Sequence, residues 1–300
     1  MHFRCYPDAV IRAVCAVIAA SAVAVAAAAQ GPAVRDVREW MTRVGERVEE
    51  YYARAQSIMC EEIVRIEPLG PDLLSNGDHV RELIYELRVA WDAAATAGTD
   101  GKPPEATVLR QLLTVDGRPP RPGDEPGCFD RKPVSTEPLG MLLRHRQQDY
   151  IFTWKGQGRE NGRASVTLEY KAIPKKEPIE VVRTGDCSEI NLPGRTRGRL
   201  WLDPVTADVL RLDEDLTGQF DVRIPPVPGR RSSASTMTIE RATSSISYRQ
   251  VTFHDPEETL TLPSSIVSLQ VIRNSGVPRV RMSQKFSKYR RFITDARILQ

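Results

Sequence analysis

The feature that most constrains the fold is the stretch at residues 198–215, whose pattern predicts an antiparallel β-hairpin. Residues 199–202 alternate polar and apolar side chains, except that the large Trp201 shares the outward parity, and residues 209–215 alternate in the same way. Asp203-Pro204 lies between them and favours a turn, because an Asp side chain accepts hydrogen bonds from the backbone ahead of it and Pro fixes φ. A hairpin with this alternation belongs to a sheet that has one wet and one dry face.

The N-terminus predicts a secretory signal peptide. Two arginines precede an apolar run at residues 13–29, which ends in small residues at Ala27-Ala28-Ala29. The alternative is a membrane anchor, but a run of about 17 residues rich in Ala is short and weakly apolar for a span. We expect the signal peptide at residues 1–29 and a single β-rich domain at residues 30–300. The mature protein is expected to be periplasmic or secreted, without an integral membrane segment.

Charge and cysteine content narrow the partners and the compartment. Removing the signal peptide lowers the net charge from +3 to +2, because the segment holds two Arg and one Asp, so charge gives no case for a nucleic-acid partner. An exported protein can form disulfides, and Cys60, Cys128 and Cys187 remain after cleavage. Cys60 shares strand parity with apolar neighbours and is expected to be buried. Cys128 and Cys187 lie in loop-like sequence and form the candidate disulfide, while the other pairings stay open.

One long helix is predicted at the start of the mature chain, and strands in most of the rest. Residues 34–56 carry apolar side chains at a three–four spacing and charged ones on the opposite face, which is typical of an amphipathic helix. A short helix is expected at residues 139–145, and Gly156 and Gly158 are expected to end the strand that begins at Tyr150. From residue 57 the period changes to two, which predicts strands, besides the hairpin, at residues 57–67, 81–91, 107–115, 150–154, 166–170, 179–183, 236–241, 245–254, 265–273 and 279–292.

The predicted fold class is mainly β (α+β). About ten strands of alternating pattern, without regular βα units, argue against a parallel α/β sheet. They favour a single large curved antiparallel sheet, or half-barrel, over a seven-strand sandwich. The apolar stripe of the N-terminal amphipathic helix needs a surface to lie on, and we expect that surface to be the dry concave face of the sheet.

The last predicted strand is strongly basic, with Arg279, Arg281, Lys285, Lys288, Arg290 and Arg291. Such a strand could attract lipid head groups or an acidic partner. The structural alternative is a basic outer face, or an edge strand that its charges protect against aggregation, and we favour this alternative.

No catalytic or metal-binding motif stands out in the sequence. The mature histidines at positions 79, 145 and 254 lack the close spacing with other ligands that a metal site needs. No Gly-x-Ser-x-Gly turn occurs, and Glu61-Glu62 point to opposite faces of a strand, which is wrong for shared acid–base work. Cys60 is more simply a buried thiol than a nucleophile. We therefore expect no enzyme, no cofactor and no metal, with a hydrolase of unknown type as the third hypothesis.

The hairpin and two shorter motifs resemble a known superfamily. Residues 198–211 read Gly-Arg-Leu-Trp-Leu-Asp-Pro-Val-Thr-Ala-Asp-Val-Leu-Arg. This resembles the G-x-[L/I]-W-[I/L]-D-P-x-T-G-x-V-x-R hairpin of exported bacterial proteins of the lipoprotein localisation factor (LolA-like) superfamily, which also includes periplasmic sigma-regulator sensor proteins. Residues 115–119 and 289–292 are similar to uncharacterised secreted relatives. The resemblance implies a half-barrel of antiparallel strands capped by helices, with a dry cavity for acyl chains or an apolar peptide. Ala207 departs from the pattern, in which this turn commonly has Gly.

The leading hypothesis is an exported, non-enzymatic protein that binds an apolar ligand, a lipid or lipoprotein acyl chain, between the sheet and the helix. The candidate cavity residues lie on the helix and on two strands: Val44, Val48, Leu83, Tyr85, Leu87, Trp91, Phe152 and Trp154. The alternative is a periplasmic protein-interaction or envelope-sensing module, whose partner is an envelope protein and whose sheet is filled by its own side chains. A filled core without a pocket above a few hundred Å³ would favour this alternative.

Overall fold

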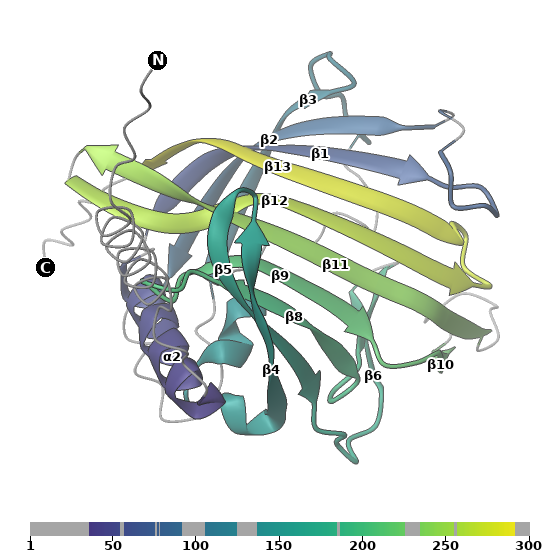
Figure 1. Cartoon of the computed structure of the whole chain (residues 1–300). Coiled ribbons are helices and arrows are strands. Elements are labelled where there is room, and N and C mark those ends of the chain that lie inside the picture. The colour runs from purple at the N-terminus through teal and green to yellow at the C-terminus, as the bar shows by residue number, and fades with distance from the viewer. Residues whose placement is uncertain are drawn as a thin grey trace, which may run out of the picture. The chain divides into compact units, whose positions relative to one another are not determined.

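The alternating pattern from residue 58 onward folds into one large antiparallel sheet (Figure 1). The computed structural model describes residues 36–54, 57–75, 77, 79–91, 106–124, 137–184, 187–225, 235–254 and 257–291. The chain divides into a unit Met1–Asp36 and a unit Val37–Gln300, and every described helix and strand belongs to the second. The signal peptide lies outside the described residues and stays a prediction.

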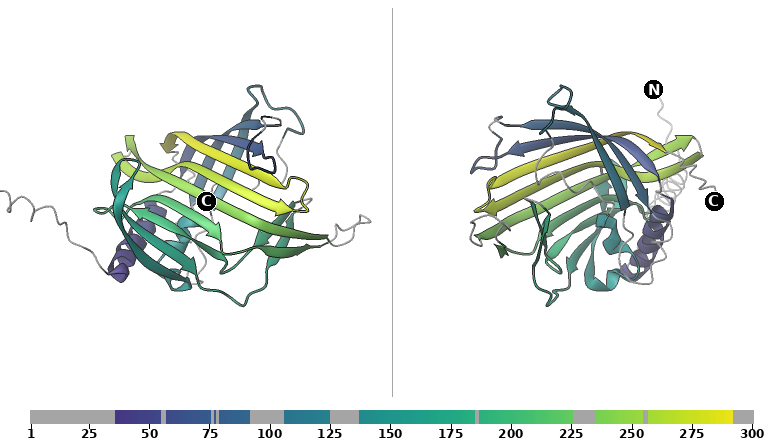
Figure 2. Two further views of the ribbon diagram at one scale, coloured as in Figure 1. Left: turned by 45° about the vertical axis from the view of Figure 1, so that its right-hand side comes forward. Right: turned by 180° about the vertical axis from the view of Figure 1, so that it is seen from behind.

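Eleven described strands make up this sheet. They are β1 (Ile58–Pro68), β2 (Arg81–Trp91), β3 (Ala106–Val115), β4 (Tyr150–Glu160), β5 (Arg163–Ala172), β8 (Thr196–Leu202), β9 (Val209–Leu216), β10 (Phe220–Ile224), β11 (Ser235–His254), β12 (Glu257–Arg273) and β13 (Arg279–Arg291). Their order is β3-β2-β1-β13-β12-β11-β9-β8-β5-β4, with β10 also beside β11. Within the described chain β3 and β4 end this order without pairing with each other, so the sheet is curved but not closed (Figure 2). The predicted single curved antiparallel sheet is confirmed. A separate small sheet pairs β6 (Glu180–Thr184) with β7 (Cys187–Asn191).

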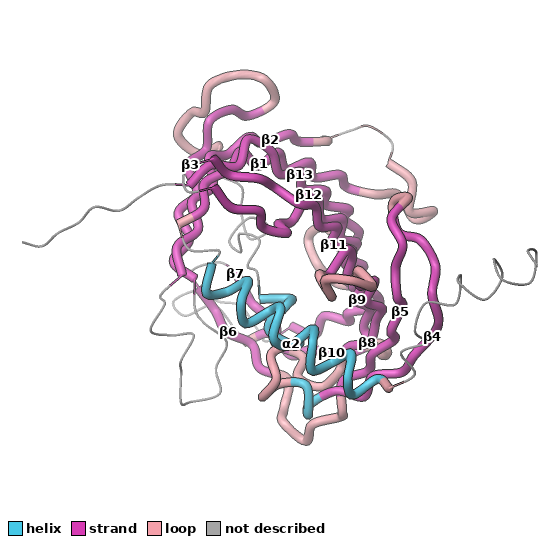
Figure 3. Tube along the Cα trace, turned by 60° about the vertical axis from the view of Figure 1, so that its left-hand side comes forward, coloured by secondary structure: helices cyan, strands magenta, loops and turns pink. Residues whose placement is uncertain are grey.

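The predicted amphipathic helix is confirmed as α2 (Val37–Arg54). Its large buried side chains are Trp40, Met41, Val44, Val48, Tyr51 and Tyr52. Figure 3 shows α2 lying across the open, concave side of the sheet, where it packs against β12 and β4. The 3-10 turns η3 (Glu137–Leu142) and η4 (Gln147–Asp149) stand in place of the predicted short helix. Gln147 fastens them to α2, because its Nε2 donates to the carbonyl oxygens of Met41 (2.8 Å) and Leu142 (2.7 Å).

The predicted hairpin is present as β8 and β9, joined by a turn at residues 203–208. Asp203 Oδ1 accepts hydrogen bonds from the backbone amides of Val205 (2.9 Å) and Thr206 (3.1 Å), which is the role expected of this Asp. Ala207 has a φ of +59°, in the left-handed region that favours glycine. Alanine in place of the superfamily's glycine therefore leaves the turn in place, with a backbone strain of about 1–2 kcal/mol.

Some strands are longer than predicted, because β-bulges allow them to continue past residues that were expected to end them. β4 continues past Gly156 to Glu160, because a register shift after Trp154 and a φ of +137° at Gly156 accommodate the glycine. Residues 235–254 form one strand of 20 residues rather than two, with two register shifts along its pairing with β12. The strands β7 and β10, of five residues each, are missing from the prediction.

The basic last strand is not an edge of the sheet. β13 pairs with β1 on one side and with β12 on the other, so the interpretation as a protected edge strand is wrong. Some of its outward charges form ion pairs instead: Lys288 Nζ lies 2.7 Å from Glu61 Oε2, and Arg281 Nη1 lies 3.8 Å from Glu67 Oε2. These exposed pairs neutralise part of the strand's charge on the outer face of the sheet.

Candidate functional site

The residues predicted to line a ligand cavity lie on α2, β2 and β4. Five of them are buried: Val44, Val48, Leu83, Tyr85 and Leu87. Phe152 and Trp154 on β4 are half-buried, and the Trp154 ring centroid lies 6.4 Å from that of Trp40 on α2. Trp91 ends β2, and its side chain lies outside the described part of the chain.

The structure distributes these residues over the inner face of the sheet instead of gathering all of them in one place. Leu83 and Tyr85 pack in a cluster with residues of β1, β3 and β13, whereas Trp154 meets α2. Val44 and Leu83 are 0% exposed, so other atoms surround them and no water-sized void touches them. The chain's own side chains therefore pack this part of the inner face in the present state, and the ligand cavity stays a prediction.

Charged contacts fasten α2 to the sheet at two places. Near the middle of the helix, Arg47 Nε lies 2.5 Å from Oδ1 of Asp208, in the turn between β8 and β9. At the C-terminal end of the helix, Arg54 Nε lies 2.5 Å from Glu258 Oε1 on β12. The side chain of Asp208 is only 4% exposed, so its pair with Arg47 is less screened than an ordinary surface ion pair. The helix thus covers the inner face with its apolar side and is held by ion pairs at the rim.

A buried polar cluster interrupts the apolar inner face. Glu62 on β1 is 0% exposed, and its Oε1 accepts hydrogen bonds from Arg110 Nη2 on β3 (2.7 Å) and Gln284 Nε2 on β13 (2.9 Å). The other oxygen, Oε2, has no hydrogen-bond partner among the described residues. The Arg110 guanidinium lies 4.9 Å from the centre of the Tyr85 ring on β2. Four consecutive strands of the sheet therefore contribute to this cluster.

Sequence reasoning missed this cluster, although part of the signal was present. The prediction that Glu61 and Glu62 point to opposite faces implies that one of them shares the parity of Cys60 and Val64. On a sheet with one dry face that parity buries Glu62, and a buried carboxylate needs hydrogen-bond partners. Its partners on β3 and β13 are distant in the sequence, so no local pattern identifies them.

Burial raises the pKa of Glu62, although Arg110 acts in the opposite direction. The folded protein therefore keeps this proton to higher pH than the unfolded chain, and the free energy of unfolding falls as pH rises from about 4.5 through the folded pKa. We expect Glu62→Gln to remove this contribution, which amounts to at most about 1.4 kcal/mol per pH unit within that window. Urea unfolding of both proteins between pH 4 and pH 8 measures the difference.

Two further groups define the control for this pH dependence. Burial also raises the pKa of Glu214, so part of the decrease in the free energy of unfolding with rising pH should remain in both the wild type and Glu62→Gln. Glu61→Gln changes the neighbouring carboxylate, which faces outward and pairs with Lys288, and should keep the pH slope of the wild type. Equal slopes for Glu62→Gln and the wild type would contradict the prediction.

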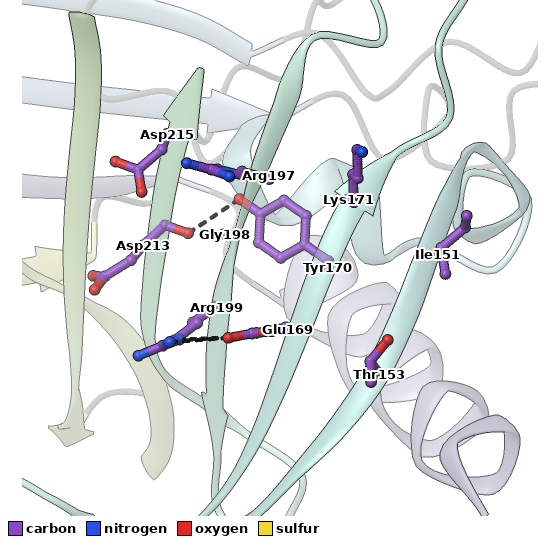
Figure 4. A pocket seen from close by; sticks show the side chains of 10 residues that line it. All are labelled: Ile151, Thr153, Glu169, Tyr170, Lys171, Arg197, Gly198, Arg199, Asp213 and Asp215. Atoms are coloured by element: carbon purple, nitrogen blue, oxygen red, sulfur yellow. Dashed lines mark hydrogen bonds and ion pairs between the residues drawn. The ribbon is translucent and has the colours of Figure 1, made fainter. Parts of the chain in front are cut away.

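The outer face of β4, β5, β8 and β9 carries a groove of about 620 Å³ (Figure 4). The register of these strands places eight side chains in two rows, Ile151, Lys171, Arg197 and Asp215 in one and Thr153, Glu169, Arg199 and Asp213 in the other. Tyr170 lies beside Gly198, and its hydroxyl donates to the carbonyl oxygen of Asp213 (3.2 Å). No sequence motif points to this groove, because only the order of the strands creates it.

The charges in this groove are mixed, and several of them pair. Glu169 lies 2.9 Å from Arg199 Nη2 and 2.6 Å from Lys155 Nζ. Lys171 and Arg197 lie opposite each other on β5 and β8, and neither forms an ion pair with another described residue. None of the ten lining residues is His, Cys or Ser. The groove is therefore a charged surface feature and offers no recognisable nucleophile–base pair.

Neither a metal site nor a membrane-spanning helix is found in the described residues. No group of three or more His, Cys, Asp or Glu side chains in this part of the chain could hold a metal ion. No described helix is long and apolar enough to cross a membrane.

The cysteines are only partly described. Cys60 is buried and free, as predicted, and burial raises the pKa of its thiol to about 12, which keeps it protonated at neutral pH. Cys128 lies outside the described residues, and the backbone of Cys187 begins β7 rather than a loop, while its side chain is not described. The candidate disulfide between them stays a prediction.

Comparison with known proteins finds similarity in structure but not in sequence. No protein-family model matches the sequence, and no curated protein matches it. Among solved structures, a putative outer membrane lipoprotein-sorting protein domain from Vibrio parahaemolyticus is 9% identical with a TM-score of 0.40, over 88% of this chain and 95% of that one. A DUF1329 family protein from Desulfovibrio piger is 12% identical with a TM-score of 0.41, over 86% and 94% of the two chains.

A LolA superfamily protein from Nitrosomonas europaea is also similar, at 10% identity and a TM-score of 0.33, over 87% of this chain and 97% of that one. The superfamily that the hairpin motif resembles is thus represented among the solved structures similar to this chain. With TM-scores below 0.5, these similarities do not identify a ligand, a partner or an activity for this chain.

Proposed function

We propose that this protein is an exported, non-enzymatic binding protein that holds an apolar ligand, a lipid or a lipoprotein acyl chain, between the sheet and α2. The observation that supports the proposal is the position of α2. The apolar side of this amphipathic helix packs against the inner face of the sheet, and ion pairs hold the helix to Asp208 and Glu258. Export rests on the sequence of residues 1–29. The non-enzymatic character rests on the lack of a catalytic motif in the sequence.

Binding in this way requires α2 to separate from the sheet, because Val44 and Val48 are packed in the closed state. The ligand then covers the apolar surface that the helix leaves. Burial of apolar surface contributes about 25 cal/mol per Å², so one acyl chain can replace much of what the helix provides. The contacts between α2 and the sheet therefore compete with the ligand.

The test weakens the contact between α2 and the sheet without changing the apolar side of the helix. Arg47→Ala leaves the nearly buried Asp208 without its cation, so the closed state loses stability relative to the open one. We expect faster uptake of the neutral apolar dye N-phenyl-1-naphthylamine, by roughly tenfold for each 1.4 kcal/mol lost from the closed state. Stopped-flow fluorescence measures the rate.

Arg144→Ala is the matched control, because it breaks an exposed ion pair between α2 and the segment after η3. Arg144 Nη2 lies 2.5 Å from Glu49 Oε2, and the two side chains are 56% and 37% exposed. Such a pair contributes at most about 1 kcal/mol, so the control should bind the dye at nearly the wild-type rate. Equal rates for Arg47→Ala and the control would contradict the role of α2 as the cover.

A protein-interaction or envelope-sensing module is the second candidate function. The complete burial of Val44 and Leu83 favours it, because an inner face filled by its own side chains needs no ligand. An envelope protein would then bind elsewhere on the surface. Failure of the wild type and of Arg47→Ala to bind any apolar dye would favour this module over the carrier.

A further inference from the structure

The strand β3 is an edge of the sheet that carries little protection against pairing with another chain. It ends the strand order, and in the part of the chain that the structure describes it pairs only with β2 (Figure 3). An edge strand directs unpaired backbone N–H and C=O groups outward, and proteins usually protect it with outward charges, Pro or a bulge. The sequence of β3 has no Pro, and Arg110 is its only charged residue. Arg110 points inward, where its Nη2 donates to Glu62 Oε1 (2.7 Å), so β3 has no charge on its outer face.

The outer face of β3 is apolar, and the charges beside it compensate each other. Leu109 is 58% exposed and Leu113 is 40% exposed. On β2, Arg88 lies opposite Leu109, and its Nη2 is 2.6 Å from Oε1 of Glu86 on the same strand. A second chain that approaches this edge therefore meets exposed leucine side chains without a net charge to repel it.

The other edge strand, β4, shows the protection that β3 lacks. Lys155 and Arg159 of β4 are exposed and both are basic. A register shift after Trp154 and a φ of +137° at Gly156 interrupt its regular pairing with β5. Basic side chains and bulges hinder the addition of a further strand. Of the two edges, β3 is therefore the better surface for strand pairing.

The regular part of β3 is complementary to itself. Residues Ala106–Leu112 pair with β2 without a register shift, and the shift that follows leaves Leu113 as an extra residue. The middle of the regular stretch is Leu109. Antiparallel pairing of this stretch with its own copy, centred on Leu109, places Leu109 opposite itself and Thr107 opposite Gln111. These pairs bring no like charges together, and they bury the exposed Leu109 side chains against each other.

We propose that β3 pairs with β3 of a second copy of this chain, antiparallel and centred on Leu109. A twofold axis at Leu109 then joins the two sheets into one continuous sheet. A single strand pair is a small interface, so the dimer forms reversibly and its population depends on concentration. This inference does not depend on the proposed function, because strand pairing at the edge requires no ligand on the inner face.

Sedimentation velocity of the purified mature protein, from low to high micromolar concentration, tests the inference. We expect a monomer–dimer equilibrium in the wild type. Leu109→Lys places two like charges opposite each other at the twofold axis and removes the apolar contact, so the dissociation constant should rise by about tenfold or more. Ile151→Lys is the matched control, because Ile151 lies on the other edge strand and is also 58% exposed. The dimer should be as stable in this control as in the wild type.

Cysteine cross-linking then tests the register. Residues directly opposite each other in an antiparallel pair have Cα atoms about 4.5–5.5 Å apart, which a disulfide can span. Leu109→Cys should therefore form a covalent dimer on mild oxidation, visible by non-reducing gel electrophoresis. Gln111→Cys should not, because the two copies of this position lie four residues apart along the strands, about 13 Å. The wild type, treated in the same way, measures the contribution of the native cysteines.

Several outcomes would overturn the inference. One is a wild type that stays monomeric at the highest concentration, and another is a dimer that Leu109→Lys weakens no more than Ile151→Lys does. Cross-linking of Gln111→Cys as readily as of Leu109→Cys would exclude the proposed register. Urea unfolding establishes whether the lysine variants are folded, and the cysteine variants keep the register testable should Leu109→Lys fail to fold. None of these outcomes bears on dye uptake, so the proposed function is tested separately.

Discussion

Gly198→Ala is expected to destabilise the protein by at least about 3 kcal/mol or to prevent folding. A Cβ at this position would overlap the carbonyl oxygen of Asp213 and come within 2.7 Å of the Tyr170 hydroxyl. Neither neighbour can move away easily, because β8 is hydrogen-bonded to β5 on one side and to β9 on the other. Urea unfolding of the purified variant, or its yield after export, measures the loss.

The close approach at Gly198 has a specific cause. Tyr170 lies directly opposite Gly198 on β5, and its hydroxyl reaches the carbonyl oxygen of Asp213 on the far side (Figure 4). An aromatic residue paired with a strand glycine covers the backbone that the missing side chain leaves exposed. Gly158→Ala on β4 is the matched control, since its Cβ would meet nothing within 4 Å. Similar losses of stability for the two variants would contradict this account of Gly198.

Val44→Asp is expected to have the second large effect, on both stability and ligand uptake. Val44 is 0% exposed on the apolar side of α2, so the substitution buries a carboxylate without a partner or forces the helix off the sheet. We expect a loss of about 3 kcal/mol or more in the free energy of unfolding. We also expect a smaller amount of a fluorescent fatty acid ester to be bound at equilibrium, because the apolar side of α2 that would contact the bound acyl chain now carries a charge.

Thr42→Asp provides the control on the same helix. Thr42 is exposed and lies two residues away, so it introduces the same charge on the solvent side of α2. Its effect on stability should stay within about 0.5 kcal/mol, with unchanged uptake. A folded Val44→Asp variant that takes up the ester as well as Thr42→Asp does would count against ligand binding under α2.

Local periodicity was sufficient to predict the helix, the hairpin and the one-sided sheet. The stripe that includes Val44 and Val48 depends on residues three or four apart, and the hairpin depends on a turn and two short runs. The order of the strands was not predictable in this way. β13 pairs with β1 through contacts between residues distant in the sequence, and β9 pairs with β11 rather than with the next strand, β10. The charges of β13 favoured an edge only because its neighbours were unknown.

The candidate site shows the same division. The parity of Glu62 with Cys60 and Val64 carried a signal of its burial, which the sequence analysis did not use. Its partners Arg110 and Gln284 depend on the order of four strands, so no local pattern could identify them. The outer groove likewise arises because β4, β5, β8 and β9 lie side by side and place Lys171 opposite Arg197. Chemistry that depends on strand order leaves no pattern within a single segment.

Native mass spectrometry of the mature protein, purified after export without detergent, tests the central claim most directly. Denaturing extraction of the same sample, followed by lipid analysis, identifies any bound molecule. We predict a non-covalent adduct that is lost on denaturation and has the mass of a lipid. Detection of the polypeptide mass alone, both after purification and after incubation with monolaurin, would contradict an apolar ligand between the sheet and α2.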